Sequence, residues 1–268
     1  TFGTDGFTVG SIAGVNGSGN GIVSWNWKAN GAGSSNTDGN NITATVSANT
    51  TSGFSICKWT GDGNAASTVG HGLGSGGIDM LIVKDTTNTG RTWYVKTRDL
   101  TSIHNLYLSA TAAQTTSSGS TGGALADLTN SNTFGFIAGS GGTYTNHTSA
   151  AMIAYCFKNV DGYSKIGSYT GNLNANGAFI YTGFKPSFIM AKRTDSTGDW
   201  YMFDNKMTPS NVAGIYHNAN KAETDHTTAA YHIDILSNGF KLRGNGTELN
   251  ASGGSYIYMA FGQPIISN

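Results

Sequence analysis

Two aromatic pairs stand out among the residues that could bind a ligand. Trp93-Tyr94 and Trp200-Tyr201 each follow a turn-like segment, and each has a charged neighbour, Arg91 in the first case and Asp199 in the second. A sugar ring can stack on an exposed aromatic face while charged side chains bind its hydroxyls. Neighbouring residues on a strand point to opposite faces, so one member of each pair could be exposed. These six residues are therefore the predicted ligand-binding set. The alternative is that the tryptophans lie in the core, because large rings dominate core packing.

Carboxylates would be needed for glycoside hydrolysis, which uses two acidic side chains across the scissile bond. The chain has only two glutamates, Glu223 and Glu248, and neither has an acidic partner two or four residues away. His232 and Asp234 share one strand face, and the simpler interpretation is a polar face in solvent. The other histidines show no metal-ligand spacing. We therefore predict no catalytic residue, no metal and no cofactor.

The charge balance limits the partners of this chain. Among 268 residues there are 15 Lys+Arg and 15 Asp+Glu, a formal net charge of zero. A nucleic-acid binder or an anionic-membrane binder would carry a basic patch, so we expect neither activity. No apolar run approaches the ~20 residues of a membrane span, so we expect no membrane insertion.

An internal duplication organises the chain. Met80–Lys84 corresponds to Phe188–Lys192, the two Trp-Tyr pairs correspond to each other, and Ile153–Phe157 corresponds to Ile257–Phe261. The spacing shifts only from 109 residues between the first matched glycines to 104 between the last matched phenylalanines. Such a long period indicates two domain-sized copies rather than a short-repeat solenoid.

The composition predicts the fold class. The chain combines 39 Gly and only 3 Pro with 12 Tyr, 12 Phe and 5 Trp, in short apolar clusters between Gly, Asn, Ser and Thr turns. This pattern is typical of an all-β protein, and no segment shows helical periodicity. We predict tandem antiparallel β-sandwiches with almost no helix. Met80–Lys84 is expected to be buried on both faces, Val212–Tyr216 to be a strand, and 110–131 to be a surface loop.

The predicted boundaries follow from the duplication. Residues 1–31 match the last two strands of a copy, so we expect the C-terminal remnant of a preceding repeat in a chain that continues N-terminally. Residues 32–52 have no equivalent at the second junction and are expected to be a flexible linker, within which Ile42–Val46 could lie along a sheet edge. The two sandwiches are then 53–160 and 161–268.

The two cysteines favour free thiols. Cys57 corresponds to Ile166 in the other copy, and Cys156 corresponds to Ala260, which indicates small buried apolar positions. The alternative is a disulfide, because the first and last strands of a sandwich are often neighbours.

Several phrases of the sequence are similar to a repeat module common in structural proteins of tailed phages, and the similarity extends from about Gly31 to Pro264. The phrases are Ser35–Gly39 (SNTDG), Val46–Ser55 (VSANTTSGFS), Thr68–Gly74 (TVGHGLG), Lys192–Trp200 (KRTDSTGDW) and Asn250–Phe261 (NASGGSYIYMAF). The resemblance implies a jelly-roll, concanavalin A-like, lectin-type sandwich on a virion, in a tail fibre or appendage. Gln263 stands where the module usually has an acidic residue, and the module has no agreed catalytic residues.

These observations lead to one hypothesis and two alternatives. We expect a non-enzymatic virion protein, exposed outside the cell, that adheres to a host-surface glycan. Its expected partners are other virion proteins and further copies of itself, as a trimer or higher oligomer. The first alternative is a secreted carbohydrate-active enzyme or its glycan-binding module. The second is a pure fibre or capsid-decoration scaffold.

Overall fold

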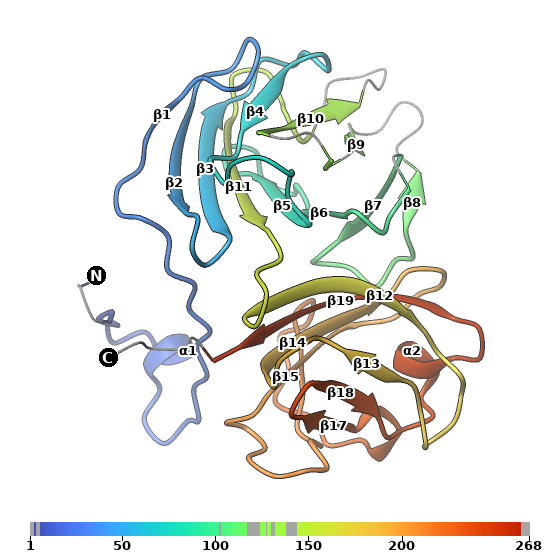
Figure 1. The fold of residues 1–268 in the computed structure, drawn as a ribbon. Coiled ribbons are helices and arrows are strands. Elements are labelled where there is room, and N and C mark those ends of the chain that lie inside the picture. The colour runs from blue at the N-terminus through green and yellow to red at the C-terminus, as the bar shows by residue number, and fades with distance from the viewer. Residues whose placement is uncertain are drawn as a thin grey trace.

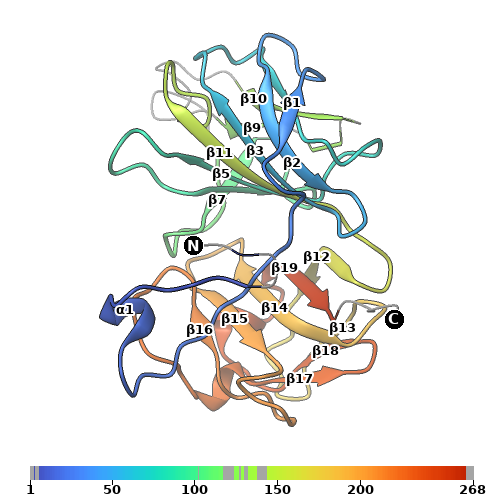
Figure 2. The same cartoon turned by 90° about the vertical axis from the view of Figure 1, so that its left-hand side faces the viewer.

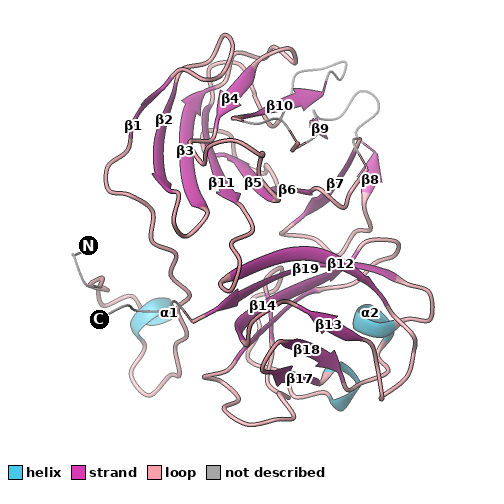
Figure 3. Ribbon diagram, viewed as in Figure 1, coloured by secondary structure: helices cyan, strands magenta, loops and turns pink. Residues whose placement is uncertain are grey.

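The computed structural model describes residues 3, 6–101, 103–116, 124–126, 128–129, 132–137 and 144–263. Antiparallel strands make up nearly all of its regular structure (Figure 3), which confirms the all-β fold class. Helix is limited to α1 (Ala13–Asn16), α2 (Thr247–Asn250) and the 3-10 turn η1 (Ala229–Tyr231) within the described residues. The strands divide into a first half, β1–β11, and a second half, β12–β19 (Figure 1).

The first half contains an eight-stranded sheet in the order β1-β2-β3-β11-β5-β6-β7-β8 and a three-stranded sheet in the order β4-β10-β9. Its strands are β1 (Ser34–Asn36), β2 (Ala44–Asn49), β3 (Phe54–Thr60), β4 (Thr68–Gly70), β5 (Met80–Asp85), β6 (Tyr94–Thr97), β7 (His104–Tyr107), β8 (Thr115–Thr116), β9 (Ala124–Leu125), β10 (Thr133–Ile137) and β11 (Ala151–Phe157). The loop expected over 110–131 contains two short strands, β8 and β9, and part of it lies outside the described residues.

The second half repeats this topology. Its sheets have the orders β12-β19-β14-β15-β16 and β13-β18-β17, which match β3-β11-β5-β6-β7 and β4-β10-β9 strand for strand. Its strands are β12 (Ser164–Thr170), β13 (Phe179–Tyr181), β14 (Pro186–Arg193), β15 (Trp200–Asp204), β16 (His217–Asn218), β17 (Ile233–Leu236), β18 (Gly239–Leu242) and β19 (Ser255–Gly262). The predicted strand Val212–Tyr216 is wrong: Ala213 and Tyr216 form only isolated bridges.

The large sheets of the two halves pack against each other. In β5, Leu81 and Val83 enter the core of the first half, whereas Met80 and Ile82 enter a third core between the halves. The alternation follows from the two-residue period of a strand, and it confirms that β5 is buried on both faces. The third core also holds Phe188, Met190 and Phe261 of the second half, so the halves share an apolar interface.

The 32–52 segment is not a linker. It contributes β1 and β2, which extend the large sheet beyond β3. Ala44 and Val46 are buried in the core of the first half, and this burial provides the free energy that orders the segment. Asn41 forms a parallel bridge with Thr68, so the same segment also lies against β4.

The described residues of the N-terminal segment do not form the strands expected of a repeat remnant. Residues 22–28 are extended without strand pairing and run alongside both halves (Figure 2). Trp25 Nε1 donates to Asp204 Oδ2 at 3.0 Å. Trp27 packs edge-on against Phe157, Phe188 and Phe261, at centroid distances of 5.5–6.1 Å. The two tryptophans thus line an apolar cavity of about 580 Å³ between the halves.

A buried asparagine holds the loop after β3 in place. Asn146 is fully buried. Its Oδ1 accepts hydrogen bonds from Trp59 Nε1 (3.1 Å) and Asp62 N (3.3 Å). Its Nδ2 donates to Asp62 Oδ1 (2.6 Å) and Asn64 O (3.1 Å). Four bonds satisfy the side-chain amide.

The second half uses the same device after β12. Asn250 is buried, and its Oδ1 accepts a hydrogen bond from Asn172 N at 2.8 Å. Its Nδ2 donates to Asn174 O (2.9 Å) and Gly244 O (2.8 Å). These asparagines are 104 residues apart, the spacing at the end of the duplication.

Both cysteines are free and buried, as the sequence favours. Cys57 Sγ and Cys156 Sγ are 3.8 Å apart on the neighbouring strands β3 and β11. Burial raises the pKa of the Cys156 thiol well above its usual value, which makes it a poor nucleophile.

Candidate functional site

The predicted binding residues of the first half lie mostly inside the protein. Tyr94 is only 5% exposed and packs edge-on against Tyr107 at 5.2 Å. Burial raises the pKa of the Tyr94 phenol. Trp93 is half-buried and stacks on Tyr155 at 6.2 Å. Arg91 is half-buried, with its guanidinium 3.7 Å from the centre of the Tyr144 ring. Trp93 and Arg91 keep some access to solvent, whereas Tyr94 is a core residue.

The predicted residues of the second half are buried. Trp200 is 1% exposed in the core between the halves, and its Nε1 donates to Tyr107 O at 2.9 Å. Tyr201 is 2% exposed and belongs to the core of the second half. Asp199 is 7% exposed. The rings of Trp200 and Tyr201 offer no face to a sugar, because both faces of β15 are covered: one by the first half and the other by the small sheet.

A polar cluster forms at Asp199 that the sequence did not predict. Glu248 Oε2 accepts hydrogen bonds from Asp199 N (2.7 Å) and Tyr201 OH (3.2 Å). Asp199 Oδ2 pairs with Lys221 Nζ at 2.7 Å, and Asp199 Oδ1 accepts from Asn220 Nδ2 at 2.8 Å. Glu248 comes from α2, far from Asp199 in sequence, so no local spacing could indicate the contact. The fold thus brings one glutamate and one aspartate together.

Lys192 lies beside this cluster, at the junction of the halves. Its side chain is fully buried, and Nζ donates to Arg193 O (2.7 Å) and to Thr111 O (3.2 Å) in the first half. Burial lowers the pKa of Lys192 to about 8, although Glu248 and Asp199 oppose the shift. The lysine therefore forms a titratable contact between the halves.

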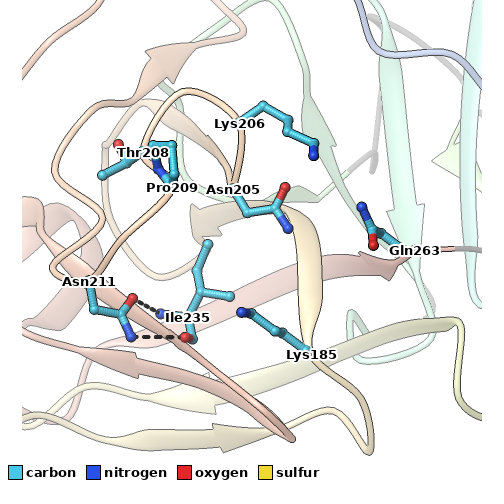
Figure 4. A pocket seen from close by; sticks show the side chains of 8 residues that line it. All are labelled: Lys185, Asn205, Lys206, Thr208, Pro209, Asn211, Ile235 and Gln263. Carbon is cyan, nitrogen blue, oxygen red and sulfur yellow. Dashed lines mark hydrogen bonds between the residues drawn. The ribbon is translucent and has the colours of Figure 1, made fainter.

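A polar pocket of about 390 Å³ opens on the surface of the second half (Figure 4). Amide, hydroxyl and ammonium groups dominate its lining, which consists of Lys185, Asn205, Lys206, Thr208, Pro209, Asn211, Ile235 and Gln263. Asn211 binds the backbone of Ile235 through both ends of its amide, at 2.8 and 2.9 Å, so it is fixed in place. Lysine ammonium and amide groups can bind the hydroxyl or carboxylate oxygens of a polar ligand.

In the parts of the chain that the structure describes, no group of three or more His, Cys, Asp or Glu residues is arranged to hold a metal ion. Asp62 and Asp85, which lie in turns, hold local backbone and side chains: Asp85 Oδ1 accepts from Thr87 N and Asn88 N, both at 2.9 Å. No helix in the described residues is long and apolar enough to cross a membrane.

The fold and these sites define an all-β protein of two duplicated sandwiches that share a core, with polar side chains around its surface pocket. The family comparison gives a match over residues 1–264 to "Domain of unknown function (DUF7483)", and the chain belongs to this family. No curated protein and no solved structure matches the chain.

Proposed function

We propose that this chain is a non-enzymatic structural protein of a phage virion, in a tail fibre or appendage, and that it adheres to a host-surface glycan. The observation that carries the proposal is the arrangement of the two sandwiches, which are packed through a shared core and present loops and polar side chains outward. Binding residues are commonly found on loops held by such a rigid scaffold. The resemblance of the sequence phrases to phage structural proteins supports the virion location.

The polar pocket supports the choice of a glycan. A polyhydroxylated ligand needs several donors and acceptors placed around it, and Asn205, Asn211 and Gln263 each supply both. Lys185 and Lys206 add two ammonium groups, which would favour acidic sugars. In the virion, the partners would be other structural proteins and further copies of this chain in a trimer or higher oligomer.

A glycan array probed with the purified chain tests adhesion, and immunogold electron microscopy of native particles tests location. We expect binding to a restricted set of glycans and labelling of an appendage. Lys185→Ala with Lys206→Ala should weaken binding to acidic glycans, and Lys165→Ala serves as a surface-lysine control. A chain that binds no glycan, yet labels the particle, would instead support the pure scaffold.

The second candidate function is a carbohydrate-active enzyme, and the position of Glu248 beside Asp199 favours it: Glu248 Oε2 accepts a hydrogen bond from the Asp199 backbone N–H at 2.7 Å. Glycosidases use two carboxylates, and Tyr201 and Lys192 lie beside Glu248. Incubating each glycan that binds with the chain and analysing for shorter products separates the candidates. We expect no product; release of product that Glu248→Gln abolishes would establish the enzyme and overturn the proposal.

A further inference from the structure

The outer faces of the two small sheets differ, although the sheets have the same strand order. In the first half, residues 36–41 lie against β4. A side chain at Gly70 would collide with Asn36, and one at Gly39 would collide with the backbone of Thr68. The approach to the Thr68 backbone requires glycine at position 39, and the segment covers β4.

Among the described residues, the second half has no such cover. β11 ends at Phe157 and β12 begins at Ser164, so no counterpart of β1 and β2 precedes the second copy. On β13, Phe179 is 45% exposed and Tyr181 is 66% exposed, while Ile180 between them is buried in the core. The two rings therefore project from the same outer face of the strand. Their Cα atoms are about 6.6 Å apart, from the rise of a strand.

Charged groups flank the two rings. Phe179 pairs with Lys241, and Lys241 pairs in turn with Asp234. Asp234 and Lys241 are half-buried and alternate with core residues, so they share the outer face with the rings. Arg243 Nε lies 3.3 Å from Asp234 Oδ2. These five residues form what is termed here the aromatic platform.

A glycine gives the platform a flat floor. Gly239 pairs with Tyr181 across the sheet. A Cβ at Gly239 would meet the Phe179 ring at 3.1 Å and would collide with the carbonyl of Ile180. The absence of a side chain lets the Phe179 ring lie over β18, next to the charged groups.

We propose that the aromatic platform binds a saccharide chain. The C–H face of a sugar ring would stack on Phe179 and Tyr181, where it removes apolar surface from water. The ring hydroxyls would donate to the Asp234 carboxylate and accept from Arg243 and Lys241. This inference rests on the proposed glycan adhesion and adds to the polar pocket a second contact surface, on β13, β17 and β18.

The composition of the platform favours a saccharide over a protein partner. A stable protein interface buries about 800 Å² on each partner and depletes charged residues at its centre. Two ring faces are far smaller than that, and Lys241, Asp234 and Arg243 lie directly beside them. A sugar needs both kinds of contact within one small area, because each of its rings has an apolar face and a polar edge.

Isothermal titration with a glycan found on the array tests the platform. Phe179→Ala and Tyr181→Ala should each weaken binding by about threefold to tenfold, from the energy of one aromatic contact. Tyr181→Phe keeps the ring and should retain most of the affinity. Ile103→Ala removes an exposed apolar side chain in the first half, 43% exposed, and should change nothing.

The outcomes separate the platform from the general function. If the wild-type chain binds and the Phe179→Ala, Tyr181→Ala double variant does not, with both equally stable to heat, the platform is supported. If the double variant binds as tightly as wild type, the platform is wrong and glycan adhesion stands. If wild type binds no glycan but self-associates, and the double variant is monomeric, the platform is a contact between copies and both proposals are overturned.

Discussion

The two halves of the molecule have one topology and two different surroundings. In the first half, β2 pairs with the outer edge of β3, and residues 36–41 cover β4. In the second half, the matching edge of β12 is closed by the Asn159 amide, which binds Ile166 N and O at 2.6 and 3.3 Å, and by Val160, which forms an isolated antiparallel bridge with Ser164. These contacts block strand addition at that edge, but they leave β13 open. The duplicated residues therefore maintain the fold, whereas the unduplicated segment 32–52 determines which small sheet has an exposed outer face.

The charged residues near the two Trp-Tyr pairs also differ between the halves. In the first half, Arg91 stacks on Tyr144. In the second half, Glu248 Oε2 accepts a hydrogen bond from the Tyr201 hydroxyl. Glu248 lies two residues before the buried Asn250, as Tyr144 lies two residues before the buried Asn146. The duplicated framework therefore holds a cation–aromatic contact in one half and a carboxylate–phenol contact in the other.

The largest expected difference between the halves concerns the two tryptophans. Trp200→Ala should lower the free energy of unfolding by about 3–5 kcal/mol, because the buried indole fills the core between the halves. Trp93→Ala should cost only about 1 kcal/mol, because its ring is only partly buried. Urea unfolding followed by circular dichroism measures both. Equal losses would contradict the assignment of the shared core.

Next in size is an effect that should be equal in the two halves. Asn146→Ala and Asn250→Ala should each destabilise by about 2–4 kcal/mol, because each removes a buried amide that makes three or four hydrogen bonds. Thermal unfolding of the two variants tests this, with Asn174→Ala, an exposed amide, as the control. A large loss in one half only would show that the loops are not held in the same way.

A smaller effect on stability comes from Lys192 in the second half and depends on pH. In the folded protein the pKa of Lys192 is about 8, below the usual 10.5. Between pH 8 and pH 10.5 the unfolded chain binds more protons than the folded protein. The contribution of Lys192 to the free energy of unfolding therefore rises with pH, by at most about 1.4 kcal/mol per pH unit. Below pH 8 the full cost of the buried charge is present.

The measurement is the difference in unfolding free energy between wild type and Lys192→Met from pH 7.5 to 10. Burial raises the pKa values of Cys156 and Tyr201, and both groups therefore lower stability as pH rises. They do so in both proteins, so the difference isolates the lysine. We expect the wild type to gain on the variant as pH rises; a flat difference would disprove the buried lysine contact.

The smallest expected effect concerns the thiols. Cys156→Ala places in the first half the residue that the second half already has at Ala260, and should cost about 1 kcal/mol or less. A reductant should leave the thermal midpoint of the wild type unchanged, because both thiols are free. A midpoint that falls on reduction would show a disulfide in solution.

Much of the fold could be predicted because its determinants are local or repeated. The continuous apolar run Met80–Val83 requires burial on both faces, and the structure supplies a second sheet to cover it. The sequence matched Ile153–Phe157 to Ile257–Phe261, and these closing strands, β11 and β19, take equivalent central places in the two large sheets. The face-to-face packing of the halves could not be predicted, because no local pattern says what covers an apolar face.

The candidate sites were harder to predict, since exposure depends on neighbours distant in sequence. Tyr94 and Tyr201 have the composition of a sugar-binding pair but point into the cores. Phe179 and Tyr181 are exposed because nothing corresponds to 32–52 in the second copy. The sequence shows that the second copy lacks this segment. It does not show that the segment covers a sheet in the first copy, because 32–52 has the composition of a linker and forms strands only when Ala44 and Val46 are buried in the core.

The core between the halves brings together corresponding residues of the two copies. Ile82 corresponds to Met190, and Phe157 corresponds to Phe261, and all four side chains meet in it. Each copy thus buries its apolar face against the same face of its duplicate, as the subunits of a twofold dimer do. Because one chain carries both faces, their association does not depend on protein concentration. Dilution, which would dissociate two separate subunits, leaves this pairing intact.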